Sequence, residues 1–149
     1  MKVCVAASAG GHLSEVLKVA KSWLPYKATY ITTTCVVRDT LARTGTVYVV
    51  GECNYQHLVR LVKVFLGCTR VMLKERPDVV ISTGAAVGCI VCFLGKLLGA
   101  KLIWVDSIAN VERLSLSGRL VRLIADVFLV QWPELAQKYR GVEYVGEVV

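Results

Sequence analysis

Short apolar runs alternate with longer segments of helical periodicity along this chain, and this alternation constrains the fold more than any other feature. The apolar runs are continuous, which is typical of strands that are covered on both faces. We expect strands at residues 3–7, 28–33, 47–50, 79–81, 102–105 and 127–130, with a further short strand at 142–145. Apolar residues recur every three or four positions in the expected helices, which are 12–24, 57–75, 86–98, 116–125 and 133–139. The sequence therefore predicts an α/β fold, with a Rossmann-like parallel sheet and helices on both faces.

Length and composition limit the number of domains. The 149 residues match one ordinary domain, and a complete two-domain enzyme does not fit this length. Hydrophobic residues make up 55% of the chain and charged residues 19%, which excludes a disordered protein. Because the sequence has neither an internal repeat nor a Pro/Gly/Ser-rich linker, we expect a single domain over residues 1–149. Such a domain is one core, or half of something larger.

The cysteines do not form a metal-binding pattern. Cys89 and Cys92 are the only close pair, and the only histidines are His12 and His57, so we expect buried reduced thiols and no metal site. The N-terminal residues lack the apolar stretch of a secretory signal. Charged residues interrupt the most apolar window, residues 84–105, so we expect no membrane-spanning helix and a peripheral contact with membranes at most.

Ligands of parallel sheets bind outside the carboxyl ends of the strands, so the loops that follow strands are the candidate binding segments. Ser8, Gly10, Gly11 and His12 lie between the first strand and the first helix. Glycines let backbone N–H groups approach a ligand, and a helix N-terminus favours an anion such as phosphate. His12 stands where a general base can sit. A tight turn with a surface histidine explains the same residues, and a dinucleotide-binding fingerprint is missing.

Two later loops carry further candidate residues. Thr83 and Gly84 follow the fourth expected strand, where hydroxyl and small residues either cap a helix or receive a sugar or pyrophosphate. Asp106 and Ser107 follow the fifth strand, which puts a carboxylate directly after an apolar run at the expected ligand edge.

The polar segment that continues from this third loop contains Arg113, Ser115, Ser117 and Arg119. Arginine forks suit pyrophosphate because they donate two parallel hydrogen bonds. The alternative is that Ser117 caps the next helix and that both arginines are solvated.

A basic stripe marks the longest expected helix. Arg60, Lys63, Arg70 and Lys74 recur at helical spacing, and most other residues of that helix are apolar. Such a helix is typical of an interface with anionic lipid, although a solvated edge on a core helix gives the same pattern. No aromatic series or recognition helix accompanies the charge, so we expect no nucleic acid partner.

Several segments together resemble a known family. They are residues 8–15 (SAGGHLSE), 81–86 (ISTGAA), 95–101 (GKLLGAK), 106–119 (DSIANVERLSLSGR), 125–133 (ADVFLVQWP) and 144–146 (YVG). The chain is similar to the membrane-associated subunit of split glycosyltransferases. These comprise the bacterial PssD/CpsF-type polysaccharide biosynthesis proteins and the anchoring subunit of the eukaryotic enzyme that adds the second N-acetylglucosamine to dolichol-linked oligosaccharide. A weaker likeness reaches MurG, a single-chain glycosyltransferase with a lipid acceptor.

The resemblance implies a fold equivalent to the N-terminal half of a GT-B glycosyltransferase. This half would bind a polyprenyl-diphosphate-linked acceptor at the cytoplasmic face of the membrane and would recruit a separate catalytic subunit. The partner would hold the UDP-sugar donor, so this chain would bind no cofactor and would be inactive alone. For the inverting transfer, His12 or Asp106 would be the base, and the glycine loop with Arg113 would hold the acceptor diphosphate.

Other functions remain open from the residues alone. The chain could be a structural membrane recruiter without catalytic residues, or a stand-alone Rossmann-like nucleotide-binding domain. A small hydrolase that uses Ser8 or Ser82 is disfavoured, because the sequence lacks G-x-S-x-G and has no histidine after His57.

Overall fold

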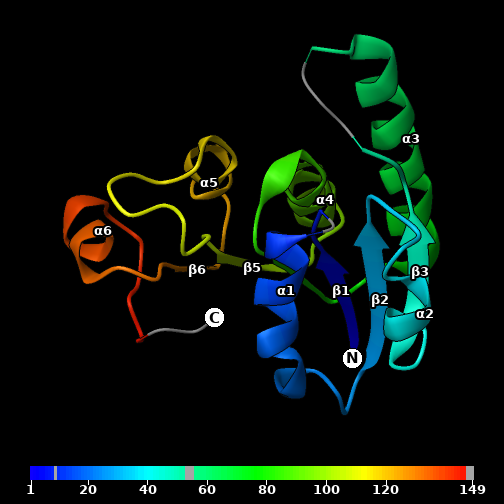
Figure 1. The fold of residues 1–149 in the computed structure, drawn as a ribbon, viewed down its shortest axis with the longest axis horizontal. Coiled ribbons are helices and arrows are strands. Elements are labelled where there is room, and N and C mark those ends of the chain that lie inside the picture. Colours follow the sequence, from blue (N-terminus) through cyan, green and yellow to red (C-terminus); the bar gives the residue numbers. More distant parts are fainter. Residues whose placement is uncertain (9, 53–55, 147–149) are drawn as a thin grey trace.

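A computed structural model describes residues 1–8, 10–52 and 56–146, and it shows a six-stranded sheet in which all neighbouring strands are parallel (Figure 1). The strands are β1 (Lys2–Ala6), β2 (Lys27–Thr32), β3 (Gly45–Val49), β4 (Val79–Ser82), β5 (Lys101–Val105) and β6 (Val127–Leu129). Their order across the sheet is β3-β2-β1-β4-β5-β6, with β1 paired to β2 and β4. The predicted Rossmann-like α/β fold is confirmed.

Helices cover both faces of this sheet. They are α1 (Gly11–Lys18), the 3-10 helix η1 (Ala20–Ser22), α2 (Arg38–Leu41), α3 (Leu58–Glu75), α4 (Ala85–Leu97), α5 (Leu116–Val121) and α6 (Pro133–Lys138). One apolar cluster joins the sheet to Leu13 of α1, Trp23 and Leu41 of α2. The other cluster contains residues of α3, α4, α5 and α6, including Val121 and Leu135. The prediction that helices cover both faces of the sheet is therefore confirmed, and two separate apolar clusters hold them there.

The helix expected at 116–125 ends earlier, at Val121, and three further elements differ from the prediction. The helix expected at 12–24 divides into α1 and η1, because Trp23 turns inward, is buried and donates a hydrogen bond from Nε1 to the Tyr30 hydroxyl at 3.2 Å. Helix α2 was not expected, and it is too short to show a periodicity. The strand expected at 142–145 is reduced to a single parallel bridge between Leu129 and Glu143.

Helix α4 packs closely on the sheet because two glycines face it. A Cβ atom on Gly88 would overlap the Ser82 hydroxyl, and one on Gly95 would lie 2.7 Å from the Val80 Cγ2 atom. Larger residues at either position would push the helix away from β4 and β5. Gly88 therefore keeps the N-terminal part of α4 near the carboxyl end of β4, and Gly95 keeps its C-terminal part near Val80.

Helix α3 extends beyond the sheet. In Figure 1 its first turns project past the carboxyl ends of the strands. Leu58 and Val59, at the start of this helix, are each 70% exposed. Two large apolar side chains are thus left uncovered where α3 extends past the carboxyl ends of the strands.

Asp126 joins three segments at the opposite edge of the sheet. Its carboxylate accepts hydrogen bonds from the Leu102 backbone N–H at 2.9 Å and from the Nζ atoms of Lys96 and Lys101 at 3.1 and 3.2 Å. The backbone hydrogen bond and the two ammonium groups lower the pKa of Asp126 to about 2. The charged form is therefore favoured in the folded state.

We expect Asp126→Asn to lower the free energy of unfolding at pH 7 by about 1 kcal/mol, since solvent screens part of the lysine contacts. Because the pKa of Asp126 is depressed on folding, its contribution is complete above about pH 4 and is lost as the pH falls towards 2. Urea unfolding at several pH values measures the difference in the free energy of unfolding between the wild type and Asp126→Asn. This difference should become smaller as the pH is lowered. Asp39→Asn, which removes a charge outside this network, is the matched control; an equal loss in both variants would contradict the prediction.

Candidate active site at the carboxyl edge of the sheet

Three loops meet at the carboxyl edge of the sheet and enclose a cavity of about 250 Å³. The cavity is lined by His12, Ala85, Ser107, Ala109, Asn110, Ser115, Leu116 and Ser117. The structure thus brings four predicted site residues together, from the loops after β1 and β5, and adds the first residue of α4. This volume is that of a small site, enough for one sugar or phosphate group.

His12 is held in place by the loop after β4. The Thr83 hydroxyl, which is fully buried, donates a hydrogen bond to the His12 backbone carbonyl at 2.6 Å. The His12 ring packs against Gly84, where an added Cβ atom would lie 2.7 Å from the ring carbon Cε1. Gly84 has a φ of 143°, which a residue with a side chain rarely adopts. Both residues therefore support the histidine, and neither lines the cavity.

Glu15 is a site residue that the sequence analysis did not select. It lies one turn after His12 on α1 and is only 8% exposed. Its Oε1 atom accepts hydrogen bonds from the Ser107 hydroxyl at 2.8 Å and the Ile108 backbone N–H at 3.3 Å. Its Oε2 atom lies 3.8 Å from His12 Nδ1. The sequence feature that could have indicated Glu15 is its spacing of three residues from His12, which puts a carboxylate and an imidazole on one side of a helix.

Asp106 is buried under the third loop, and it does not line the cavity. Its Oδ1 atom accepts hydrogen bonds from Trp104 Nε1 at 3.2 Å and the Ser115 hydroxyl at 2.7 Å, and its Oδ2 atom accepts one from the Ser115 backbone N–H at 3.1 Å. Ser115 is also the N-cap of α5, because its hydroxyl accepts the Gly118 backbone N–H at 2.8 Å. The geometry therefore favours a structural role for Asp106 over the expected role as base.

Arg113 lies beside the cavity. It is exposed, and together with Ala109, Asn110, Val111 and Glu112 it lines a second surface hollow of about 340 Å³. Ala109 and Asn110 line both hollows, so the two adjoin. A ligand that fills the first cavity can therefore extend towards the Arg113 guanidinium. The alternative role of Ser117 as a helix cap is wrong, because Ser115 is the N-cap of α5; Ser117 lines the cavity.

The glycine loop leaves its backbone open. Gly10 has a φ of 100°, and Cβ atoms added to Gly10 or Gly11 would meet no atom within 4 Å. Ser14 donates hydrogen bonds from its backbone N–H and its hydroxyl to the Gly10 carbonyl, at 3.1 and 3.2 Å. Ser8 is half-buried, and residue 9 between them lies outside the described residues. The space beside both glycines is therefore open among the described residues, and anion binding at this loop stays a prediction.

The basic stripe lies on the exposed side of α3. Its four members, Arg60, Lys63, Arg70 and Lys74, are all exposed. They border an apolar face that is also exposed and consists of Leu58, Val59, Val62, Phe65, Leu66 and Leu73. We call this combined surface the α3 face.

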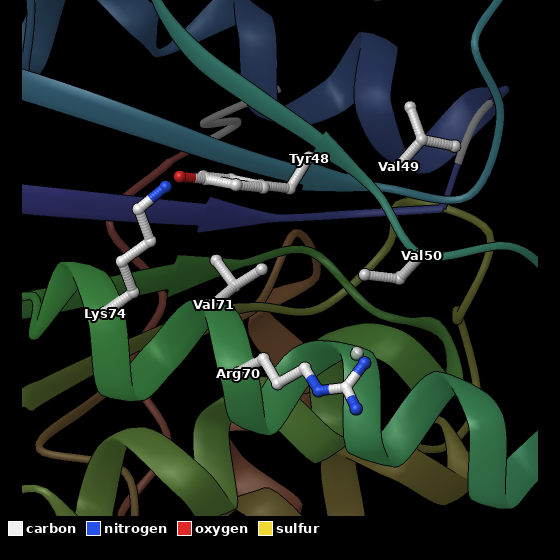
Figure 2. A pocket seen from close by; sticks show the side chains of 7 residues that line it. Tyr48, Val49, Val50, Arg70, Val71 and Lys74 are labelled. Atoms are coloured by element: carbon white, nitrogen blue, oxygen red, sulfur yellow. The ribbon is translucent and has the colours of Figure 1, made fainter.

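A hollow of about 360 Å³ separates the basic side of the α3 face from β3. Figure 2 shows the Lys74 side chain extending from α3 to the Tyr48 ring, with Arg70 one turn earlier on the same helix. The Lys74 ammonium lies 5.3 Å from the ring centroid, and its contact with Tyr48 raises the pKa of Lys74. The Tyr48 hydroxyl donates a hydrogen bond to Glu75 at 2.7 Å.

The described residues contain no cluster of His, Cys, Asp or Glu side chains that could hold a metal ion. Cys4, Cys68 and Cys92 are buried free thiols, and burial raises the pKa of Cys4 and Cys92. Cys53 lies outside the described residues. None of the described helices is long and apolar enough to cross a membrane.

The family model and the related proteins that match this chain point to the same family. A family model described as "Oligosaccharide biosynthesis protein Alg14 like" matches residues 41–148. The UDP-N-acetylglucosamine transferase subunit ALG14 of Candida albicans is 31% identical over an alignment of 173 residues, which covers 99% of this chain and 78% of that protein. The corresponding subunit of Schizosaccharomyces pombe is 46% identical over 77 residues, which cover 48% of this chain and 37% of that protein. The chain thus spans most of one relative and well under half of the other.

Among solved structures, MurG from Acinetobacter baumannii has the same fold as this chain. The two superpose with a TM-score of 0.77 at 16% identity, over 98% of this chain and 46% of MurG. The predicted equivalence to the N-terminal half of a GT-B glycosyltransferase is therefore confirmed at the level of fold. The relatives have the name of the eukaryotic transferase subunit, whereas the likeness to PssD/CpsF-type proteins stays a prediction.

We expect Asp106→Ala to lower the free energy of unfolding by about 2–3 kcal/mol, because the Trp104 and Ser115 donors lose a buried charged acceptor. Urea unfolding measures this loss. Glu112→Ala, which removes an exposed carboxylate from the same loop, should change stability by less than about 0.5 kcal/mol. A similar small change in Asp106→Ala would rule out the structural role.

Proposed function

The chain belongs to the Alg14-like family of oligosaccharide biosynthesis proteins, and from this membership and the cavity at His12 we propose that it is the acceptor-side subunit of a two-component glycosyltransferase. In this proposal it binds a polyprenyl-diphosphate-linked sugar. A separate subunit supplies the UDP-sugar, which the names of the relatives suggest is UDP-N-acetylglucosamine. The observation that carries the proposal is a histidine on the wall of a sugar-sized cavity, at the edge of the sheet where parallel folds bind ligands.

His12 is the general base of the proposed reaction. The acceptor hydroxyl attacks the anomeric carbon of the donor sugar from the face opposite the leaving group. As the new C–O bond forms and the bond to UDP breaks, the hydroxyl proton passes to the neutral imidazole. Thr83 holds the His12 backbone and Gly84 packs against the half-buried ring, which supports this role because a general base needs a fixed position.

The acceptor diphosphate lies, in this proposal, across the open backbone of Gly10 and Gly11 and towards Arg113. The start of α1 offers backbone N–H groups and the positive end of the helix dipole, and the exposed Arg113 guanidinium can donate paired hydrogen bonds; both would stabilise a diphosphate. The partner subunit closes the cavity from outside and holds UDP. The chain itself needs no cofactor for these tasks.

The α3 face holds the subunit peripherally at the cytoplasmic surface of an anionic membrane. Its apolar side enters the interfacial region of the lipid, and its four cations remain at the headgroups. Because α3 projects from the same edge of the sheet as the cavity, a lipid-linked acceptor can reach His12 without leaving the membrane.

We expect His12→Ala to lower kcat of the assembled enzyme by at least about 100-fold without dissociating the two subunits, since general base catalysis contributes that much. The assay co-expresses both subunits and follows transfer of radiolabelled N-acetylglucosamine to a polyprenyl-diphosphate acceptor. His57→Ala, which replaces the only other histidine, is the control and should retain full activity. Near-normal turnover by His12→Ala would assign the chemistry to the partner and leave this chain as a recruiter.

We expect reversal of two charges, Arg60→Glu with Lys63→Glu, to weaken binding to vesicles that contain phosphatidylserine by at least about 30-fold, because each basic residue contributes about 1 kcal/mol. Sedimentation of the protein with vesicles of defined composition measures this. Lys18→Glu with Lys21→Glu makes the same charge change on α1 and η1 and should have less effect. Equal weakening by both pairs would show that net charge, and not the α3 face, determines binding.

A further inference from the structure

Two buried polar atoms face each other beside the cavity without a hydrogen bond. They are His12 Nδ1 and Glu15 Oε2, which are 3.8 Å apart, and neither has a hydrogen-bond partner among the described residues. A carboxylate oxygen that is removed from water requires a proton donor nearby. The imidazole is the group that can provide one, if its proton lies on Nδ1.

We propose that Glu15 is a positioning residue that keeps the His12 proton on Nδ1 and so leaves the Nε2 lone pair free to accept the proton of the acceptor. The proposal rests on the role of His12 as base. When the imidazole takes up that proton during transfer, the Glu15 carboxylate also stabilises the resulting cation. Glu15 touches neither substrate nor donor in this scheme; it acts through His12.

The second oxygen of Glu15 connects the base to the loop after β5. Glu15 Oε1 accepts hydrogen bonds from the Ser107 hydroxyl and the Ile108 backbone N–H. Ser107 lines the same cavity as His12, and its Oγ also accepts the Ala109 backbone N–H at 3.3 Å. One carboxylate therefore fixes both the tautomer of the base and the loop that forms the opposite wall.

This geometry makes Glu15→Gln a sharp test, because the amide has only one acceptor. A hydroxyl can rotate, but the Ile108 N–H cannot, so the amide carbonyl must stay on the loop side. The amide NH₂ then faces His12 Nδ1 and requires that atom to accept a hydrogen bond. The variant should therefore carry the His12 proton on Nε2, with the base blocked.

The first measurement is nitrogen-15 NMR of the histidine rings in the full chain. It is made at a pH high enough for both imidazole rings to be neutral. Only two histidines contribute, and His57→Gln assigns them. We expect an Nδ1–H tautomer for His12 in the wild type and an Nε2–H tautomer in Glu15→Gln. Ser107→Ala is the matched control, since it removes a partner of Oε1 and leaves Oε2 unchanged; it should keep the Nδ1–H tautomer.

The second measurement is the activity of the assembled enzyme. Glu15→Gln should lower kcat roughly 10- to 100-fold with little change in KM for the acceptor, a smaller loss than that of His12→Ala. Glu15→Asp retains a carboxylate and should recover part of the rate. An Nε2–H tautomer in the wild type, or the same tautomer in wild type and Glu15→Gln, would overturn the proposal.

The two proposals fail in different ways. If His12→Ala remains active while the tautomers change as expected, the role of His12 as base is wrong and the control of its proton by Glu15 stands. If His12→Ala is inactive while the tautomers do not change, the base is retained and Glu15 is only a loop anchor. Thermal unfolding of each variant confirms that the compared chains are folded.

Discussion

Parallel pairing of the strands is the constraint on which the rest of this structure depends. Every parallel strand needs a crossover connection, so all strands end at one edge and all following loops meet there. The order β3-β2-β1-β4-β5-β6 puts β1 beside β4 and β4 beside β5. Loops that are far apart in the sequence thereby line one cavity. The strand order alone therefore determines where the candidate site lies.

Two buried carboxylates then give these loops their shape. Asp106 holds the start of α5 through the side chain and backbone of Ser115, and Glu15 holds Ser107 and Ile108 from the opposite side. Each is buried because it accepts several hydrogen bonds, which offset the cost of removing a charge from water. They differ in one respect: the described contacts use both oxygens of Asp106, whereas one oxygen of Glu15 faces His12.

The strands of the sheet could be predicted from the sequence, because continuous apolar runs have few alternative structures. Each of the six strands expected between residues 3–7 and 127–130 is present, with ends within one or two residues of the prediction. Helix ends were less accurate, since the burial of Trp23 depends on Tyr30 in the next strand. The role of Asp106 could not be read from its position, because its partners lie at residues 104 and 115 and only folding brings them together. The importance of Glu15 likewise depends on a loop more than 90 residues away.

The small volume of the cavity has a consequence for how the proposed enzyme finds its substrate. About 250 Å³ holds a sugar or a diphosphate and not a whole lipid-linked acceptor, so the described site alone would bind that acceptor weakly. Attachment through the α3 face would confine enzyme and acceptor to the same plane, where collisions are set by the number of molecules per unit area. The fraction of sites that are occupied would then depend on the number of acceptor molecules per unit area of the leaflet. Diluting the surrounding solution would not change that fraction.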